Sequence, residues 1–310
     1  MKKSIVGIFA IILMAFLAAC STDTPGSESS GDDEADNGTI TIGFSISTLN
    51  NPFFVDLRDG AESTADEEGV EIIVADAQDD SSKQLNDIED LLQQDIDILL
   101  VNPTDDEAIV AGIESANAAE IPVITVDRSA ADGEVVTHIA SDNIAGGEMA
   151  GQFIADALGE DGGDMVELEG IAGVLATLER GEGFHNIVDE IEEIEVVANQ
   201  TANFDRTEGL SVMENILQGN SDISAVFAHN DEMALGAVEA LDSQGLLDDV
   251  IVVGFDATDD ARNAVEEGRM QATIAQQPLL ISEEAIKAAV DVVNGETVED
   301  FIPVDLELIE

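Results

Sequence analysis

Short apolar runs rich in β-branched residues alternate with longer amphipathic segments from residue 39 onward. In the first half of this region the apolar runs cover residues 39–45, 70–75, 96–101 and 122–126, and helical patterns cover 52–68, 81–94 and 106–118. Strands that are apolar at almost every position are typical of a parallel sheet with helices on both faces. We therefore predict consecutive βαβ units.

The same alternation restarts after a strand at 135–140 and continues almost to the end of the chain. Further strands are expected at 165–168, 196–198, 225–227, 250–253 and 272–275, and helices at 145–158, 179–193, 205–217, 233–243, 259–267 and 282–293. A last extended segment covers 301–309. The predicted fold class is α/β, with two Rossmann-like lobes, because about 270 residues are enough for two hydrophobic cores.

The first twenty residues resemble a bacterial export signal. Lys2 and Lys3 precede an apolar run over residues 5–19, which is shorter than the roughly 20 residues that a spanning helix needs. Leu-Ala-Ala-Cys at 17–20 resembles a lipobox, in which cleavage leaves the cysteine as the lipid-bearing first residue. We expect a signal peptide at 1–19, and a lipidated Cys20 with a flexible acidic tether at 20–38. An ordinary cleaved signal with an incidental cysteine is the alternative.

The charge balance is strongly acidic, with 68 Asp and Glu against 10 Lys and Arg. Such a surface repels nucleic acid and anionic lipid headgroups, so neither is an expected partner. It also repels itself in dilute buffer, because the Debye length grows from about 3 Å at 1 M salt to about 30 Å at 0.01 M. We hypothesise a high-salt habitat. Cys20 is the single cysteine, so no intrachain disulfide is available.

Polar and aromatic residues follow the predicted strands at their carboxyl ends, where open parallel sheets bind ligands. They are Asn50, Asn51, Pro52, Phe53, Phe54, Asp127, Arg128, Asn230, Asp231, Asp256 and Gln276, together with Arg180 and Phe204. Of these, Arg180 and Phe204 are expected at helix starts. Carboxylates and amides accept hydroxyl protons, guanidinium groups donate hydrogen bonds, and phenyl faces cover C–H surface. This set suits an uncharged polyol with an apolar ring face.

The two arginines also have ordinary structural explanations. Arg128 could form an ion pair with the neighbouring Asp127. Arg180 could pair with Glu179 or Glu182 at a solvated helix end. The sequence alone leaves these alternatives open.

Seven short motifs recur together in the order and at the spacings of a known family. They are Ser47-Thr48-Leu49-Asn50-Asn51-Pro52-Phe53-Phe54, Pro122-Val123-Ile124-Thr125-Val126-Asp127-Arg128, Arg180-Gly181-Glu182-Gly183-Phe184, Asn203-Phe204-Asp205-Arg206, Asn230-Asp231-Glu232-Met233-Ala234-Leu235-Gly236, Val253-Gly254-Phe255-Asp256 and Ala272-Thr273-Ile274-Ala275-Gln276. Over about residues 39–310 the chain resembles the ribose-binding proteins of bacterial ABC sugar importers, which are type I periplasmic binding proteins of the ribose/galactose type.

The resemblance implies a sugar pocket between two lobes that close about a hinge. The expected N-terminal lobe comprises 39–141 plus 277–304, and the C-terminal lobe comprises 142–276 plus 305–310. It further implies that the phenyl rings lie on the faces of the sugar and the polar groups on its hydroxyls. The ten candidates for these contacts are Asn51, Phe53, Phe54, Asp127, Arg128, Arg180, Phe204, Asn230, Asp256 and Gln276. The departures from the family concern the shape of the cleft: Val174, Leu175 and Leu178 in an expected loop before Arg180, and Ala257 in place of a glycine.

The implied function is capture of D-ribose outside the cytoplasm and its delivery to the permease of an ABC importer. No cofactor, no metal and no enzymatic activity are expected. The resemblance leads us to expect a monomer anchored to a membrane by a lipid on Cys20, with a chemoreceptor as a further candidate partner. Another aldose or a furanosyl signalling molecule remains open as the ligand.

Two other classes of protein compete with this interpretation. A glycosidase could use Asp127 and Asp256, but one carboxyl would need a raised pKa, whereas adjacent arginines favour ionised aspartates. A sugar-responsive regulator shares the two-lobed core but would begin with a basic helix-turn-helix. His138, His185 and His229 lack metal-ligand spacing, and His229 is expected to be a packed loop residue.

Overall fold

The computed structural model describes residues 38–310, which form one compact unit. The predicted signal peptide, Cys20 and the tether up to residue 37 lie outside the described residues. Within residues 38–310 no helix is long and apolar enough to cross a membrane.

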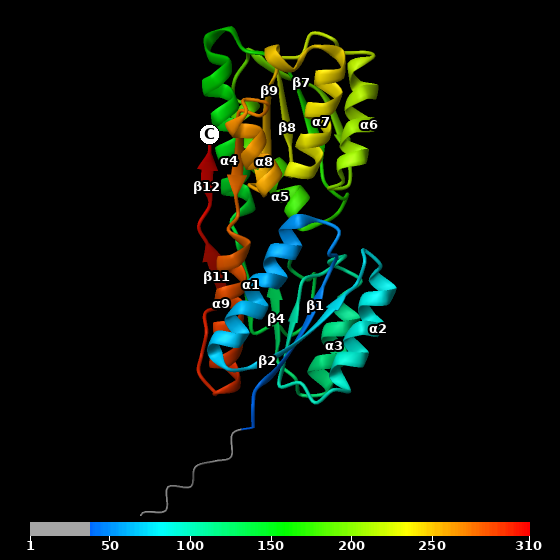
Figure 1. The fold of residues 1–310 in the computed structure, drawn as a ribbon, viewed down its shortest axis with the longest axis vertical. Helices are drawn as coiled ribbons and strands as arrows, with labels where there is room; N and C mark the ends of the chain where they lie inside the picture. Colours follow the sequence, from blue (N-terminus) through cyan, green and yellow to red (C-terminus); the bar gives the residue numbers. More distant parts are fainter. Residues whose placement is uncertain (1–37) are drawn as a thin grey trace, which may run out of the picture. The chain divides into compact units, whose positions relative to one another are not determined.

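The first lobe is a six-stranded parallel sheet with the strand order β11-β5-β4-β3-β1-β2 (Figure 1). Its strands are β1 (Thr41–Ile46), β2 (Glu71–Asp76), β3 (Ile98–Val101), β4 (Val123–Val126), β5 (Thr137–Ser141) and β11 (Phe301–Val304). The helices α1 (Pro52–Glu68) and α9 (Pro278–Val293) pack together on one face, and α2 (Ser81–Leu92) and α3 (Val110–Ala118) on the other. Each face buries its own apolar cluster, as the continuously apolar strands predict.

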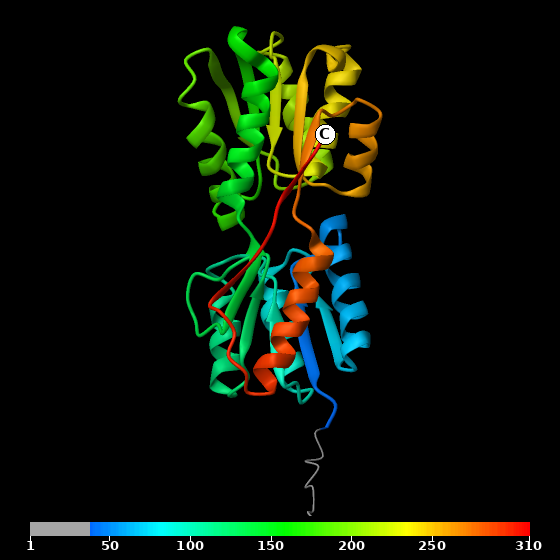
Figure 2. The same cartoon turned by 90° about the vertical axis from the view of Figure 1, so that its left-hand side faces the viewer.

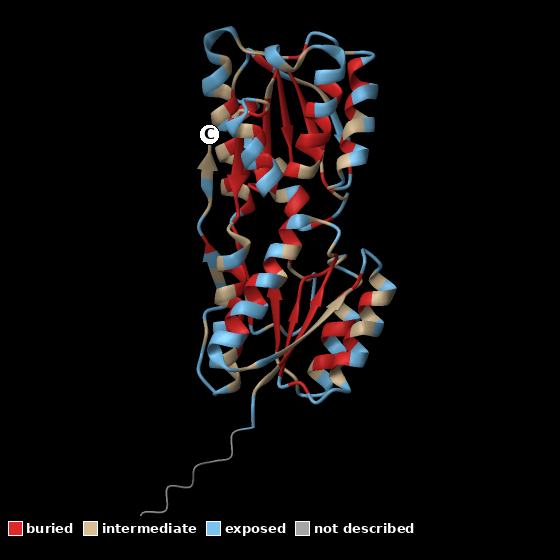
Figure 3. Ribbon diagram, in the orientation of Figure 1, coloured by how far each residue is buried: buried red, intermediate tan, exposed pale blue. Residues whose placement is uncertain are grey.

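The second lobe repeats this plan with the strand order β12-β10-β9-β8-β6-β7, in which only β12 is antiparallel. Its strands are β6 (Gly163–Glu169), β7 (Ile194–Thr201), β8 (Ala225–Ala228), β9 (Ile251–Asp256), β10 (Ala272–Ala275) and β12 (Glu307–Ile309). Its α-helices are α4 (Asn143–Leu158), α5 (Leu175–Val188), α6 (Arg206–Leu217), α7 (Asp231–Gln244) and α8 (Asp259–Glu266). The central strands β6, β8, β9 and β10 are largely buried, while the edge strands β7 and β12 and the outer helix faces are more exposed (Figure 3).

The structure confirms the α/β class with two parallel-sheet lobes and corrects several elements. The helix predicted at 179–193 is α5, which begins four residues earlier and ends five residues earlier. It runs through Gly181 and Gly183, and Gly183 lies close against α4: a β-carbon there would lie 2.0 Å from the backbone oxygen of Ile144. The last extended segment is two strands, β11 and β12, which belong to different sheets.

Three chain segments connect the lobes (Figure 2). They lie between β5 and α4, between β10 and α9, and between β11 and β12. The Ser141 hydroxyl donates to the backbone oxygen of Gln276 over 3.2 Å, and the Gln277 side chain donates to the backbone oxygen of Asp305 over 2.7 Å. Side-chain hydrogen bonds therefore link each connection to a neighbouring one.

Candidate functional site

All ten candidate residues line one small cavity between the two lobes. The first lobe contributes Asn51, Phe53 and Phe54 from the start of α1, and Asp127 and Arg128 from the end of β4. The second lobe contributes Arg180, Phe204, Asn230, Asp256 and Gln276. Ala176 of α5 also lines the cavity and was not anticipated from the sequence.

Helix capping fixes the two asparagines. The Asn51 side chain accepts from the backbone N–H of Phe53 over 3.0 Å, and Asn230 Oδ1 accepts from the backbone N–H of Met233 over 3.0 Å. Each asparagine is thus the N-cap of the helix that follows, which is a strongly preferred role for this residue type. Capping uses the amide oxygen, so the amide nitrogen of Asn51 remains available as a donor. The amide nitrogen of Asn230 already donates to the backbone oxygen of Phe204 over 3.3 Å and has one further hydrogen to donate.

Three site residues have a backbone conformation that L-residues rarely adopt. The φ angles are 64° at Asp127, 59° at Phe204 and 114° at Asp256. Such conformations cost free energy and concentrate at functional sites. They turn the chain sharply as it leaves a strand or enters a helix, and thereby place these side chains at the cavity.

Arg180 is fixed by contacts within the second lobe. Its Nε donates to Asn143 Oδ1 over 2.9 Å, and its Nη1 donates to the backbone oxygen of His229 over 2.6 Å. Its guanidinium lies 3.9 Å from the ring centre of Phe255, and Nη1 lies 3.9 Å from Asp256 Oδ1. The ion-pair partner is therefore Asp256, and not Glu179 or Glu182 as the sequence suggested. Arg180 also lies inside α5, so the prediction that it sits at a helix start was wrong.

Arg128 does not form an ion pair with Asp127 among residues 38–310, although the two are adjacent in sequence. Its Nη1 donates to the backbone oxygen of Pro103 over 3.1 Å, while Asp127 Oδ2 accepts from Asn102 Nδ2 over 3.3 Å. The Arg128 guanidinium lies 5.0 Å from the ring centre of Phe54. These contacts leave guanidinium and carboxylate groups free to bind a ligand separately.

Burial raises the pKa of both Asp127 and Asp256, and the neighbouring arginines oppose this shift only in part. The expectation that the arginines dominate was wrong, because both carboxyls lose almost all contact with water. Asp256 Oδ1 also accepts from Gln276 Nε2 over 2.6 Å. Both aspartates therefore hold a proton more readily than they would if the adjacent arginines alone set their pKa values.

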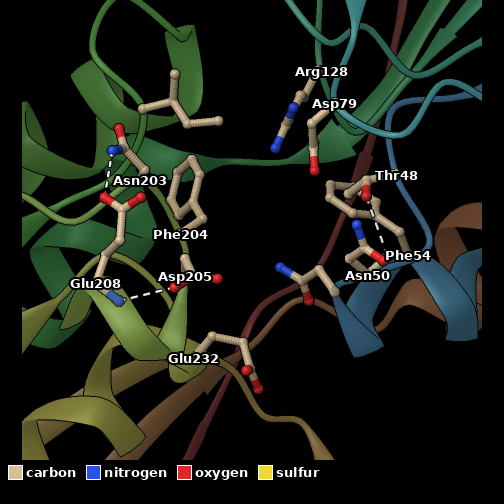
Figure 4. A pocket seen from close by; sticks show the side chains of 12 residues that line it. Thr48, Asn50, Phe54, Asp79, Arg128, Asn203, Phe204, Asp205, Glu208 and Glu232 are labelled. Atoms are coloured by element: carbon tan, nitrogen blue, oxygen red, sulfur yellow. Dashed lines mark hydrogen bonds between the residues drawn. The ribbon is translucent and has the colours of Figure 1, made fainter. Parts of the chain in front are cut away.

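Phenyl rings from opposite lobes face one another across the site. Phe54 of α1 and Phe204, which precedes α6, lie on the two sides of the space in Figure 4. The Phe53 and Phe54 rings form an edge-on pair with their centres 5.2 Å apart. Two opposed apolar faces suit a flat ring with C–H surface on both sides.

The inner cavity holds about 20 Å³, which is room for about one water molecule. Beside it lies an outer chamber of about 430 Å³, which shares four of its lining residues: Asn51, Phe54, Arg128 and Phe204. Acidic side chains line much of the rest of the outer chamber, among them Asp79, Asp205, Glu208 and Glu232 (Figure 4). The lobes are thus drawn tightly together around the inner residues.

The residues named as departures from the family lie differently from expectation. Leu175 and Leu178 belong to α5 and are 37% and 57% exposed, so they do not form a loop over the site. Val174 is buried and is the N-cap residue directly before α5. His229 is fully buried and its Nε2 lies 2.9 Å from Glu167 Oε1, which confirms the packed loop position.

Asn102 and Asn143, which bond to Asp127 and Arg180, were not anticipated from the sequence. Asp231, noted there at a strand end, accepts from Thr258 and Thr273 behind the site. Asn102 directly follows β3, so the rule applied to the other strands could have found it. Asn143 and Asp231 are each the first residue of a helix, where a cap or turn role is the usual explanation. Within residues 38–310 no group of three or more His, Cys, Asp or Glu side chains is arranged to hold a metal ion.

The strand ends of two α/β lobes meet at a site of buried carboxylate, guanidinium, amide and phenyl groups. This arrangement is that of a binding protein for a small polar molecule. The chain belongs to a periplasmic binding protein family: the model of that family, described as a periplasmic binding protein domain, matches residues 42–297. This family membership places the chain among extracytoplasmic binding proteins, which are not enzymes.

Relatives of this chain are named as sugar-import proteins. The ribose import binding protein of Bacillus subtilis is 52% identical over 308 residues, covering 99% of each chain. That of Escherichia coli is 50% identical over 269 residues, covering 87% of this chain and 90% of the relative. A solved solute-binding protein of Bacillus halodurans with bound myo-inositol superposes with a TM-score of 0.84 at 37% identity, covering 89% of this chain and 96% of the other.

Proposed function

We propose that this protein captures D-ribose between its lobes and delivers it to the permease of an ABC importer. The observation that carries the proposal is the convergence of all ten candidate side chains, five from each lobe, on one cavity. Relatives named as ribose import binding proteins, at about half identity over nearly the whole chain, support the choice of sugar.

The chemistry of the cavity fits a pentose. Asp127 and Asp256 accept hydrogen bonds from sugar hydroxyls, and Arg128 and Arg180 donate to hydroxyl and ring oxygens. The amides of Asn51, Asn230 and Gln276 complete the set, while Phe53, Phe54 and Phe204 cover the ring. A sugar that lacks one hydroxyl leaves a buried polar group unpaired, so its affinity falls by far more than the loss of one exposed contact would cause.

Sugar entry requires the lobes to separate, because the inner cavity holds about 20 Å³. We assign the lobes to 39–141 plus 277–304 and to 142–276 plus 305–310, with hinges in the three connecting segments. Those segments are short and joined by hydrogen bonds, so we expect them to bend together.

We further propose that residues 1–19 are a signal peptide and that a lipid on Cys20 anchors the monomeric protein to a membrane. The expected partners are the importer permease and, as a second candidate, a chemoreceptor that binds the closed form. Mass spectrometry of the mature protein tests the anchor: a first residue other than a diacylglyceryl cysteine would contradict it, and Cys20→Ala is expected to release the protein from membranes.

The acidic surface supports a halophilic habitat. A net charge of −58 repels itself most strongly at low ionic strength. We expect the midpoint of thermal unfolding to fall as sodium chloride is lowered from 2 M to 0.05 M. An equal or higher midpoint in dilute buffer would contradict this proposal.

Calorimetric titration of the purified chain in molar salt tests the choice of ligand. D-Ribose is expected to bind with one-to-one stoichiometry, more tightly than D-allose, L-arabinose, D-galactose or D-glucose. Binding of a different aldose alone would retain the role in import and change the sugar. A relative 38% identical to this chain is named as a D-apiose import binding protein, so D-apiose belongs in the series.

A further inference from the structure

Helix α5 brings Arg180 and Ala176 to the site, yet its own lobe gives it no side-chain cap. It begins after Val174, whose side chain has no oxygen, and it has no acidic residue in its first turn. The other four α-helices of the second lobe begin at residues whose side chains accept from their first turn: Asp142, Asp205, Asn230 and Thr258. The start of α5 therefore depends on an acceptor from elsewhere.

That acceptor comes from the first lobe. Asp106 Oδ2 accepts from the backbone N–H of Leu175, the first residue of α5, over 2.9 Å. Asp106 lies in the loop between β3 and α3, 69 positions earlier in the chain. A carboxylate at a helix N-terminus accepts a free N–H and also interacts favourably with the helix dipole.

The Asp106 side chain is partly buried, while its hydrogen bond to Leu175 lies at an exposed edge of the contact between the lobes. Its Oδ1 is buried and has no hydrogen-bond partner among residues 38–310. Burial raises its pKa, while the Leu175 N–H and the charge of Arg128 oppose the increase. The Leu175 N–H lies across the cleft, so Asp106 makes this hydrogen bond only where the two lobes meet.

We propose that Asp106 is an interlobe latch: its carboxylate caps α5 only when the lobes are closed and thereby favours the closed, sugar-retaining arrangement. This inference rests on the proposed function. Asp106 is a positioning residue, because it lines neither chamber and acts through the helix that carries Arg180. When the lobes separate, the start of α5 loses this cap and its N–H returns to water.

The latch predicts a specific kinetic effect. Replacing a helix-capping acceptor by alanine weakens a helix start by about 0.5–2 kcal/mol, which corresponds to about 2- to 30-fold in an equilibrium constant. Because apparent affinity scales with the population of the closed form, Asp106→Ala is expected to weaken D-ribose binding about five-fold. The loss should lie in the dissociation rate, with the association rate nearly unchanged.

Asp105 offers a matched control one residue away. Its Oδ1 accepts from the backbone N–H groups of Glu107 and Ala108, within its own loop. Asp105→Ala should therefore lower the thermal midpoint of the sugar-free protein while leaving ribose dissociation within about two-fold. Asp106→Ala should do the reverse, with an unchanged sugar-free midpoint and a smaller stabilisation by ribose.

A second variant tests the mechanism directly. Val174→Thr keeps the branched shape of this buried side chain and adds a hydroxyl, which gives α5 an acceptor in both open and closed arrangements. In the Val174→Thr background the effect of Asp106→Ala on dissociation should shrink below about two-fold, a non-additive result. Stopped-flow measurement of D-ribose dissociation from the full chain in molar salt compares the wild type, Asp106→Ala, Val174→Thr and the double variant, with Asp105→Ala as the control.

The outcomes separate the two proposals. Three results would overturn the latch while the proposed function stands. They are a wild-type ribose dissociation rate in Asp106→Ala, equal effects of Asp105→Ala and Asp106→Ala on that rate, and full additivity of Asp106→Ala with Val174→Thr. If another aldose binds instead of ribose, the proposed ligand is wrong and the latch is measured with that aldose. If no aldose binds, the proposed function and the latch both fail.

Discussion

Replacement of Arg180 by lysine tests whether the shape of the guanidinium group, rather than its charge, builds the site. Arginine donates through a rigid planar fork, whereas lysine places a single ammonium at the end of a flexible chain. In the structure the fork reaches Asn143 and the backbone oxygen of His229 at once, and the group stacks on Phe255. One lysine nitrogen cannot reproduce this arrangement.

The magnitude follows from the hydrogen bonds that are lost. A hydrogen bond from a charged group to the sugar contributes about 1.5–3 kcal/mol, so loss of one such bond corresponds to about 10- to 150-fold in an equilibrium constant. We expect Arg180→Lys to weaken ribose binding within that range. We also expect a lower thermal midpoint, because both partners belong to the second lobe and Asp256 keeps a less well-placed counter-charge.

Calorimetric titration with ribose and thermal unfolding in molar salt measure the two effects. Arg269→Lys is the control, because Arg269 is partly exposed and its nearest ion-pair contact, to Asp242, is 4.0 Å long. Its affinity should stay within about two-fold of the wild type. Affinity within three-fold of the wild type in Arg180→Lys would refute the assignment, and a lower midpoint alone would show that Arg180 supports the lobe without binding sugar.

Three further predictions concern pH and backbone conformation. Burial raises the pKa of Asp231 to about 7. Between pH about 4 and 7 the folded protein therefore binds more protons than the unfolded chain, so the free energy of unfolding decreases as pH rises through this range. The thermal midpoint of Asp231→Asn minus that of the wild type should therefore be more positive at pH 8 than at pH 5. An equal difference at the two pH values would contradict this prediction. Burial lowers the pKa of His138 to about 4, so the unfolded chain binds more protons below pH about 6.5 and stability falls as pH drops toward 4. His138→Gln should show a smaller loss of midpoint between pH 7.5 and 4.5, and an unchanged loss would argue against the assignment. Ala257 has a φ of 54°, so Ala257→Gly should raise stability by about 0.5 kcal/mol in urea unfolding, since the strain relieved slightly exceeds the added chain entropy, whereas helical Ala261→Gly should lower it.

The sequence by itself determined the alternation of strands and helices and most of the residues at the strand ends. Continuously apolar runs specify buried parallel strands, and the position directly after such a strand places a residue at the binding edge. Asp127 and Asp256 were found in this way. The motifs around them added the family, because their order and spacing retain the connection between distant parts of the chain.

Tertiary structure alone decided which of these residues meet and with what balance of energies. Arg180 pairs with Asp256, 76 positions later, instead of its acidic neighbours, because the packing of α4 on α5 extends the helix and directs the guanidinium inward. The raised pKa values of the buried aspartates depend on how much water the two lobes exclude together. The bond from Asp106 to Leu175 depends on the distance between lobes, which local pattern does not encode because it reports only on neighbours within a few residues.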